Sequence, residues 1–200
     1  DDYGHNNGIY VGGGRTVDEI SDSVFNVNGT KNDNIAMLVG DSAGQGVITK
    51  TENTTINIAA TNGVKDDSNA KNGTGIYMYD GKVTIGKQTV IKGDSNDVFI
   101  TIRNRDNHNN ELKLESGTNS GEQIVLEATG SNNIGINIQD GNSLASHQAT
   151  LKIESGSNTK GWNINFIGKN NIGIKNNQFA KTLSIKNTAT TYPGGTANGN

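Results

Sequence analysis

Short runs of aliphatic residues that alternate with polar ones recur along the whole chain. The clearest runs are three to five residues long and lie at residues 83–85, 98–102, 112–114, 124–126, 134–138, 151–153, 164–166, 172–174 and 183–185. A period of two is typical of β-strands, because successive side chains point to opposite faces. Clusters of Asn, Gly, Ser and Asp separate the runs, and these residues favour turns. About sixteen runs can be traced and no window has a helical period, so the pattern predicts an all-β fold.

The runs also repeat as a unit of three. Residues 111–119 match 150–158 at a shift of 39, residues 124–126 match 164–166 at 40, and residues 132–136 match 170–174 at 38. Weaker copies extend upstream, and they give two series of equivalent positions. The first strand of the unit recurs near Val24, Val47, Val83, Leu112, Leu151 and Leu183, and the third near Ile9, Ile35, Ile76, Ile100, Ile136 and Ile174. A repeated unit of this size is the signature of a solenoid.

The repeat predicts a right-handed parallel β-helix of about six coils, each with three short strands. Inward residues would stack as aliphatic columns, and each strand would pair with its equivalents in the neighbouring coils. We expect one segment over residues 1–200, with coils from about 6 to 186 and an irregular tail at 187–200. Both ends would expose unpaired strands, so we expect a piece of a longer rod that continues in further coils of its parent chain.

Asn recurs at the turn before the third strand of every proposed coil. Asn tolerates left-handed backbone and bonds its own backbone in turns, and stacked amides can also bond to each other. We therefore expect a structural ladder of Asn side chains. Its predicted members are Asn7, Asn34, Asn72, Asn96, Asn133 and Asn171.

An antiparallel β-sandwich or barrel is the competing fold. Its hairpins favour Asn-Gly or Asp-Gly turns, and such pairs occur at residues 28–29, 62–63, 80–81 and 140–141. The single Pro is consistent with the β-helix, because internal strands need every N–H for pairing. The fixed repeat favours the β-helix, and the sandwich stays open as an alternative.

Composition limits the possible functions. The chain has 31 Asn and 27 Gly but only 7 Leu, and its Ile, Val, Leu and Phe number 43 of 200 residues, close to the disordered range. Repetition changes that picture, because stacking gathers few aliphatics into one narrow core. A net charge of −3 gives no electrostatic reason to bind nucleic acid or anionic membrane. The absence of Cys excludes disulfides and thiolate metal sites, and no apolar run is long enough to span or insert into a membrane.

Several motifs together resemble a known family. They are Asn-Asn-Ile-Gly-Ile at 132–136 and 170–174, Gly-Ile-Tyr-Met at 75–78, and the Leu-Lys-Ile-Glu-Ser-Gly type at 112–117 and 151–156. In an Asn-, Gly- and Thr-rich chain without Cys, they resemble the passenger domains of type V autotransporters, which are β-helical adhesins and toxins of Gram-negative bacteria. The resemblance spans residues 6–186.

The resemblance implies a stalk that is secreted through an outer-membrane β-barrel and displayed outside the bacterial cell. The anchor would be a C-terminal region that lies outside this sequence. The implied role is adhesion and virulence, and the implied partner is a host cell-surface protein or carbohydrate.

The most distinctive candidate surface lies at residues 99–110. If Val98, Ile100 and Ile102 point inward, strict alternation places Phe99 and Arg103 outside. Two of the three Arg residues of the chain lie in this segment, and Arg beside an aromatic residue is common at binding hot spots. An ordinary outer face that ends in a loop is the alternative. The candidate receptor- or glycan-binding residues are Phe99, Arg103, Arg105, Asp106 and His108.

A second aromatic set could form a strip along one side of the solenoid. Tyr10 and Tyr77 each follow an Ile that would face inward, and Tyr79 lies close by in sequence. Packing against a loop is the alternative for these side chains. Trp162 shares parity with Ile164, so we expect it in the core or at a corner.

Catalysis has weaker support than binding. A pectate-lyase-like enzyme would need clustered Asp with an Arg or Lys base, and the pair Asp66-Asp67 lies in a polar loop. Glu115 and Glu154 occupy the same repeat position and would stack as two carboxylates one coil apart, although duplication also produces such pairs. The isolated His residues indicate no metal site. We expect a non-catalytic binding segment without cofactor or metal, with a polysaccharide-degrading enzyme and a membrane-active cytotoxin passenger as alternatives.

Overall fold

Eighteen β-strands and no helix make up the described part of the chain. The computed structural model describes residues 6–29, 34–60, 73–104, 110–119, 121–140, 151–154, 161–176 and 183–186. The strands form three sheets, called here sheets A, B and C. Sheet A contains β1 (Asn6–Val11), β5 (Asn34–Val39), β8 (Thr74–Met78), β11 (Val98–Asn104), β14 (Ile134–Asp140) and β17 (Ile172–Asn176).

The other two sheets are built in the same way. Sheet B contains β2 (Thr16–Val17), β6 (Gly46–Glu52), β9 (Gly81–Gly86), β12 (Glu111–Glu115), β15 (Leu151–Glu154) and β18 (Leu183–Lys186), and β3 (Ile20–Ser21) also pairs with β6. Sheet C contains β4 (Val24–Gly29), β7 (Thr55–Ala60), β10 (Val90–Gly93), β13 (Ile124–Ala128) and β16 (Trp162–Phe166). Each strand therefore pairs with its equivalents one coil before and one coil after it.

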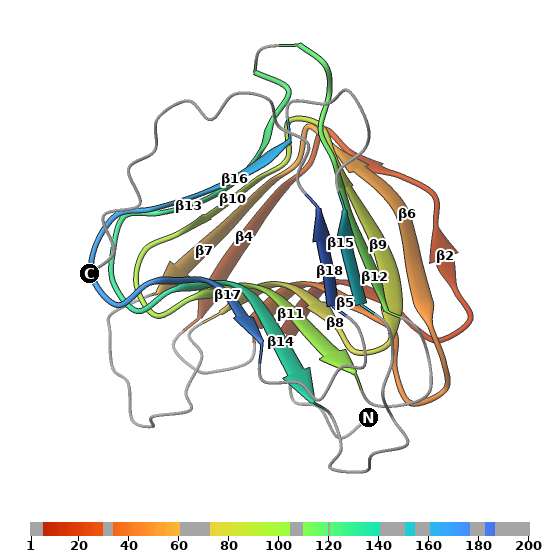
Figure 1. Ribbon diagram of the computed structural model, residues 1–200. Coiled ribbons are helices and arrows are strands. Elements are labelled where there is room, and N and C mark those ends of the chain that lie inside the picture. Colours follow the sequence, from red (N-terminus) through yellow and green to blue (C-terminus); the bar gives the residue numbers. More distant parts are fainter. Residues whose placement is uncertain are drawn as a thin grey trace.

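The pairing pattern confirms the predicted parallel β-helix. Ladders within sheets A, B and C are parallel, and the one antiparallel bridge among the described residues joins Asp41 and Gly44. The sheets form the three sides of a triangular tube (Figure 1). From β5 through β6 and β7 to β8, the chain runs counterclockwise while advancing toward the viewer, so the solenoid is right-handed. The β-sandwich alternative was wrong, because its hairpins would be antiparallel.

The coils are less uniform than the sequence repeat predicts. Six strands were expected on each side, whereas sheet A contains six strands, sheet B seven and sheet C five. All third-strand positions lie in sheet A, as predicted. Val24 was expected in the first-strand series but lies in sheet C, where it pairs with Thr55. The first strand of that coil is instead split into β2 and β3, with the exposed acidic residues Asp18 and Glu19 between them.

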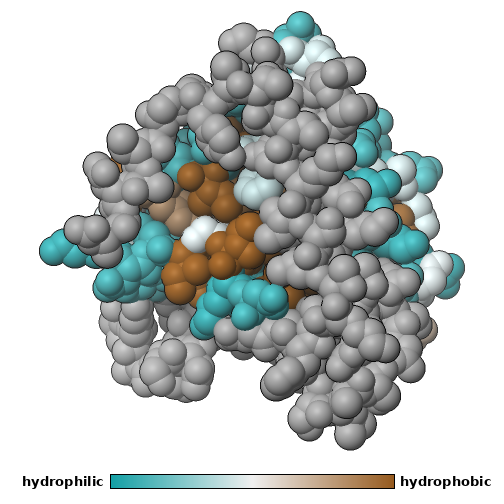
Figure 2. Space-filling model, in the orientation of Figure 1, coloured by the Kyte–Doolittle hydropathy of each residue, from teal (hydrophilic) through white to brown (hydrophobic). Residues whose placement is uncertain are grey.

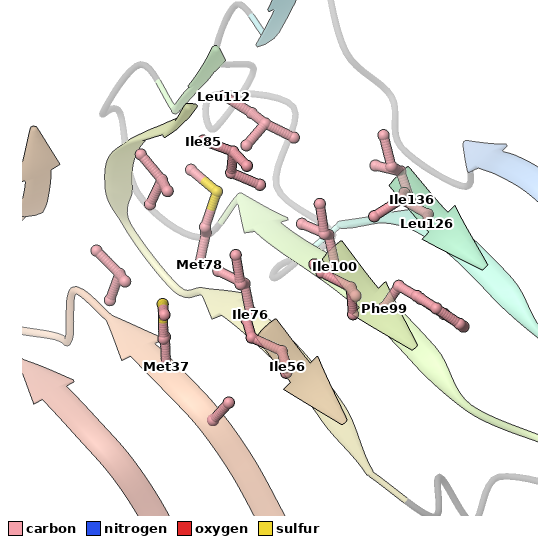
Figure 3. Close-up of a cluster of buried hydrophobic side chains, with 14 of the residues drawn as sticks. Met37, Ile56, Ile76, Met78, Ile85, Phe99, Ile100, Leu112, Leu126 and Ile136 are labelled. Atoms are coloured by element: carbon pink, nitrogen blue, oxygen red, sulfur yellow. The ribbon is translucent and has the colours of Figure 1, made fainter. Parts of the chain in front are cut away.

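The core consists of aliphatic columns that run along the solenoid axis. Met37, Ile76, Ile100 and Ile136 are partners in successive strands of sheet A, and each has no exposed surface. Figure 3 shows these side chains together with those that sheets B and C contribute. Full burial of one such side chain contributes about 1.5–3 kcal/mol. A chain with few aliphatics can therefore fold, because every coil adds to the same narrow column.

Phe99 is a correction to the sequence prediction, because it lies in the core and not outside. Its side chain has no exposed surface and belongs to the main hydrophobic cluster, as does that of Ile100. The alternation of inward and outward side chains therefore breaks at the first residues of β11, where the chain leaves a corner of the triangle. Val98, which was expected inside, is buried but lies outside that cluster.

The corner position of Phe99 is occupied by small residues in other coils. Its equivalents include Gly75 and Gly135, as the flanking register pairs show. A Cβ at Gly135 would lie 2.5 Å from the backbone oxygen of Gly173, so that coil has no space for a side chain there. In the coil of Phe99 the sizes are reversed, since the large Phe99 of sheet A faces the small Gly93 of sheet C. A Cβ at Gly93 would lie 2.7 Å from the Phe99 ring.

The Phe99 ring also contacts a ring two coils away. Its centroid lies 5.0 Å from that of Phe166, with the planes tilted by 42°. The coil between them has Ala128 and Gly135 at the corresponding positions. The two rings therefore fill the space that this coil leaves open, and such a pair contributes about 0.5–1.5 kcal/mol beyond its buried area.

The two ends of the described solenoid leave apolar side chains exposed. Val24 is 65% exposed at one end, and Ile167 and Ile172 are 63% and 42% exposed at the other. Figure 2 shows apolar side chains in a recess at the end that faces the viewer, next to polar side chains. Edge strands of this kind can pair with a further strand.

Candidate functional site

The outer face of sheet B is charged and alternates in sign from coil to coil. Lys82 is the register partner of Glu111, and Glu111 is the register partner of Lys152 in the next coil. Opposite charges on neighbouring strands favour this register, each by about 0.2–1 kcal/mol. This pattern is typical of a solvated face whose charges favour one register between neighbouring strands.

The register of sheet B also contradicts the predicted pair of stacked carboxylates. Glu154 pairs with Lys113, whereas Glu115 pairs with Gly86 on its other side. The register between β12 and β15 matches Leu112 with Ile153, which is two residues away from the match expected from sequence similarity. Glu115 and Glu154 are therefore not register partners, contrary to the prediction that they stack.

The outer face of sheet C combines β-branched residues with polar pairs. Asn57 donates from Nδ2 to Oδ1 of Asn26 at 2.8 Å. Two coils further on, Lys92 and Glu127 form an ion pair at 3.2 Å between Nζ and Oε1. In each of these exposed pairs the polar groups interact with one another within the sheet. These groups are therefore not available to another partner.

The outer face of sheet A differs from both, because it is aromatic and apolar in part and is largely shielded from solvent. One line of register partners along this face is called here the outer column, and it carries the aromatic strip that the sequence suggested. Its members, in coil order, are Tyr10, Leu38, Tyr77, Thr101, Asn137 and Lys175. Tyr10 is 48% exposed, whereas Thr101 and Asn137 are 0% and 3% exposed. The column therefore changes from aromatic and apolar to polar along the axis.

Arg103 lies beside the outer column on the same face. Its Cζ is 5.4 Å from the ring centroid of Tyr79, which fits a cation–π contact. Tyr79 is buried and Arg103 is half-buried, so the guanidinium is held in place and not freely solvated. Gln139 is the register partner of Arg103 in the next coil and adds another polar side chain.

Of the predicted binding residues, the two that the structure describes lie on opposite sides of β11. Arg103 lies on the outer face of sheet A, whereas Phe99 points into the core. Arg105, Asp106 and His108 lie outside the described residues. The sequence pattern thus predicted the strand and the outer position of Arg103, but not the inward position of Phe99.

Two polar atoms of the outer column were missed by the sequence prediction. Thr101 Oγ1 and Asn137 Oδ1 are buried, and neither has a hydrogen-bond partner in the structure. The two residues are direct register partners on β11 and β14. An isolated Thr and an isolated Asn carry no signal in a sequence rich in both, and only the register shows that they are neighbours.

A glycine-rich corner holds the first coils together. The Tyr10 hydroxyl donates to Asp41 Oδ2, which also accepts from the backbone N–H of Gly13 at 3.0 Å. The backbone N–H of Ala43 donates to Oδ1 at 2.7 Å. The Tyr10 hydrogen bond is the main cause that lowers the pKa of Asp41, and the same bond raises the pKa of Tyr10. Since both carboxylate oxygens have donors, this corner is structural.

The Asn-rich turns before sheet A form two columns of stacked side chains. In the outer of these, Asn96, Asn132 and Asn170 all have left-handed backbone, with φ of 68°, 62° and 58°. Asn132 donates from Nδ2 to Asn96 Oδ1 at 2.9 Å, and Asn170 donates to Asn132 in the same way at 3.2 Å. Because these side chains repeat in three successive coils, they stabilise the turn conformation and the register of these coils together.

The inner column contains Asp97, Asn133 and Asn171. The backbone N–H of Asp97 donates to Asn133 Oδ1 at 3.0 Å, and that of Asn133 donates to Asn171 Oδ1 at 2.8 Å. Of the predicted ladder residues, Asn96 therefore lies in the outer column, and Asn133 and Asn171 in the inner one.

The remaining predicted ladder residues lie elsewhere or are not described. Asn34 pairs with Asn6, whereas Asn7 pairs with Ile35 and is exposed. The residue in register with Asn34 is thus Asn6, one position before the expected Asn7. Asn72 lies outside the described residues.

Asp97 stands in the inner column where the next two coils have Asn, and its carboxyl is strongly perturbed. Burial raises its pKa to about 8, and the nearby Asp94 carboxyl adds to the rise. Its Oδ2 accepts from the backbone N–H of Asp94 at 2.9 Å, whereas Oδ1 is buried without a hydrogen-bond partner. In the next coil, Asn133 uses its Nδ2 to donate to the backbone oxygens of Asp94 and Gly130, at 2.8 and 3.1 Å. Asp97 has no exposed surface, and it occupies the turn position where the next two coils have an amide.

Comparisons with known proteins identify no relative. No family model matches the chain, and the searches of curated proteins and of solved structures found no match. Across the described ranges, no group of three or more His, Asp or Glu side chains could hold a metal ion. The same residues include no helix that is long and apolar enough to cross a membrane.

Proposed function

We propose that this chain is a non-catalytic β-helical segment of a bacterial surface adhesin, displayed outside the cell and anchored in the outer membrane through another part of its parent protein. The observation that carries the proposal is the difference between the three outer faces. Sheets B and C present exposed polar groups that interact with each other, whereas sheet A presents aromatic side chains and Arg103, whose guanidinium lies over the Tyr79 ring. This face is suited to recognition of a host receptor or glycan, and the autotransporter-like motifs support the same role.

The mechanism of such a segment is geometric. Stacked aliphatic columns and turn ladders hold the outer side chains at fixed spacing, so little conformational entropy is lost on binding. Display of many copies on one cell would add avidity to weak single contacts. The exposed strand edges at the ends suit pairing with further coils of the parent chain.

Cell binding by variants of the outer faces tests this function. The joint substitution of Tyr77→Ala and Arg103→Ala removes the aromatic and cationic groups of sheet A, and it should reduce binding to host cells by at least about tenfold. Lys82→Ala and Lys113→Ala together form the matched control, because both residues lie on the outer face of sheet B. Equal binding by the unsubstituted chain and the sheet A variant, with the same unfolding midpoint for both, would contradict the proposal.

The enzyme alternative is tested in the same preparation. Incubation with acidic polysaccharides, with and without Ca²⁺, should release no unsaturated or reducing products. Steady product release that depends on the folded chain would replace the adhesin proposal with a polysaccharide-degrading activity. For the cytotoxin alternative, dye release from liposomes is the corresponding measurement, and none is expected.

A further inference from the structure

We propose that the two ends of this solenoid are complementary to each other, so that a second copy of the chain docks head to tail on the first. The contact joins the edge strands β17 and β18 of one copy to the edge strands β1 and β2 of the next. The inference goes beyond the proposed function, because it concerns the ends of the solenoid and another copy of the same chain. Three features of the edge strands support it.

The first feature is the inner column of sheet A, which is incomplete at both ends. Its four central members have no exposed surface, whereas Ile9 and Ile174, which end the column, are only half-buried. Figure 2 shows apolar side chains in a recess at one end of the solenoid. A copy stacked in the register of the existing coils would place Ile9 next to Ile174 and bury both. Open strand edges beside such a column favour pairing with a further strand.

The second feature is the outer column of sheet A, whose two ends have complementary chemistry. Lys175 ends this column on β17, and Tyr10 ends it on β1. The Tyr10 ring is 48% exposed, and its hydroxyl donates to the carboxylate of Asp41. In a stack, Lys175 of one copy and Tyr10 of the next would lie on neighbouring strands, about 4.8 Å apart. The ammonium group could then contact both the ring and the carboxylate.

The third feature is the charge pattern of sheet B. Glu154 and Lys186 are register partners of opposite charge. Val17 and Ile185 belong to one line of register partners, so Asp18, the residue after Val17, would follow Lys186 in a stack. Asp18 is exposed. The alternation of charge would therefore continue across the contact, and opposite charges on neighbouring strands favour one register.

The topology limits the contact to two of the three sides. With β2 and β3 counted as one strand, sheets A and B have six strands each and sheet C has five. One strand position between β16 and β4 would therefore stay open in a stack. Because the two ends of the solenoid differ, every docked copy leaves one free end of each kind. A contact of this type continues into a filament and does not close at two copies.

Association of the unsubstituted chain is the first test. Sedimentation velocity should show species larger than the monomer, and their proportion should rise with protein concentration. Negative-stain electron microscopy should show straight rods that are one solenoid wide. Side-by-side association would instead give wider particles.

Variants that block one end each are the second test. Asn7→Lys with Asp18→Lys adds positive charge at the end that would meet Lys175 and Lys186, and both substituted residues are exposed. Ile172→Glu with Lys175→Glu adds negative charge at the other end. Each variant alone should stay monomeric, because its one open end meets only blocked partners. An equimolar mixture should form pairs and stop there, because one open end of each kind is present.

Val90→Lys with Glu115→Lys is the matched control. It makes the same change in net charge as Asn7→Lys with Asp18→Lys, but on β10 and β12 of the central coils. This control should form rods like the unsubstituted chain. Thermal unfolding shows whether each variant keeps the fold. Asp18→Lys alone is the milder variant, and it should weaken association by at least about tenfold even if the double variant does not fold.

Two outcomes would overturn this inference. One is a chain that stays monomeric at its highest soluble concentration. The other is association of both end variants on their own, because the contact would then lie on the sides of the solenoid. Both results would leave the proposed function standing, since that function depends on cell binding by the sheet A face. Failure to bind host cells would contradict the proposed function and leave the end contact standing.

Discussion

Position 97 has a carboxyl group where the same turn of the next two coils has an amide. Asn133 and Asn171 use amide nitrogens to donate to backbone oxygens, whereas the carboxyl of Asp97 can donate only when it is protonated. Burial raises the pKa of Asp97 to about 8, so this carboxyl keeps its proton to a higher pH than an exposed Asp does. A sequence rich in Asn and Asp gives no hint of this difference, because both residues are common in turns.

Asp97→Asn should therefore stabilise the protein. An amide supplies permanently the donor that Asp97 has only as a neutral acid, and at pH 8 the free energy of unfolding should rise by about 1–3 kcal/mol. Urea denaturation measures the change. Asp22→Asn is the matched control, since Asp22 is an exposed turn carboxyl that accepts from Asn53 Nδ2. A loss of stability in Asp97→Asn would show that the carboxyl has a role that an amide cannot replace.

The pH profile of the same pair gives the sign of the effect. The carboxyl has a pKa of 3.8 in its ordinary state and about 8 in the fold, so between these values the folded protein holds a proton that the unfolded chain has released. This contribution to stability is complete below about pH 4 and is lost as the pH rises through about 8, by on the order of 1 kcal/mol per pH unit. Asp97→Asn should remove that part of the pH dependence.

At the scale of elements, the corner between sheets C and A depends on matched side-chain size. The sequence predicted β11 correctly but not the inward position of Phe99, because simple alternation does not include the bend at the start of the strand. The reciprocal pattern of Gly93 with Phe99, and of Phe166 with Gly173, is visible only once the register is known. Strand positions thus follow from local pattern, whereas the direction of a corner residue follows from its neighbours in other coils.

Gly135→Ala and Gly173→Ala form a pair that tests this packing. A Cβ at position 135 would lie 2.5 Å from the backbone oxygen of Gly173, whereas a Cβ at 173 would meet nothing closer than Ile164 Cδ1 at 3.7 Å. Gly135→Ala should therefore lower the free energy of unfolding by about 1–3 kcal/mol through overpacking. Gly173→Ala should change it by less than about 1 kcal/mol. If Gly135→Ala lost as little stability as Gly173→Ala in thermal or urea denaturation, the backbone at this corner would relax easily and the predicted overpacking would be wrong.

The register of sheet B shows a second limit of sequence reasoning. Similarity between residues 111–119 and 150–158 predicts that Leu112 pairs with Leu151, but the strands pair Leu112 with Ile153. Charge explains the choice, since the observed register places Glu111 opposite Lys152 and Lys113 opposite Glu154. The expected register would place like charges opposite each other, which is unfavourable. Sequence identity between repeats is therefore a weaker guide to pairing than charge complementarity.

At the scale of the whole molecule, the solenoid is a one-dimensional stack in which each coil contacts its neighbours. The repeat in the sequence predicted this architecture, because a chain whose strands pair with their equivalents in neighbouring coils must form such a stack. The outer face of sheet A could not be predicted in the same way. Its character depends on which of two alternating sets faces outward in each coil, and on groups such as Thr101 and Asn137 that meet only through the register.

Stability should therefore depend on position along the axis, and Ile100 and Ile174 give a matched comparison. They occupy the same column, but Ile100 lies between Ile76 and Ile136, whereas Ile174 is in the edge strand β17 and is only half-buried. Ile100→Ala should cost about 3–5 kcal/mol, because it leaves a cavity with neighbours on both sides. Ile174→Ala should cost about half as much.

Amide hydrogen exchange distinguishes this behaviour from a uniform two-state fold. Ile174→Ala should speed exchange mainly in β16 and β17, because an edge coil of a solenoid can open while the others remain stacked. Ile100→Ala should speed exchange in the strands on both sides of β11. If Ile174→Ala instead raised exchange equally in β1, β5 and β8, the coils would be unfolding as one cooperative unit. Rigid presentation of the sheet A face would then depend on the last coil as much as on the central ones.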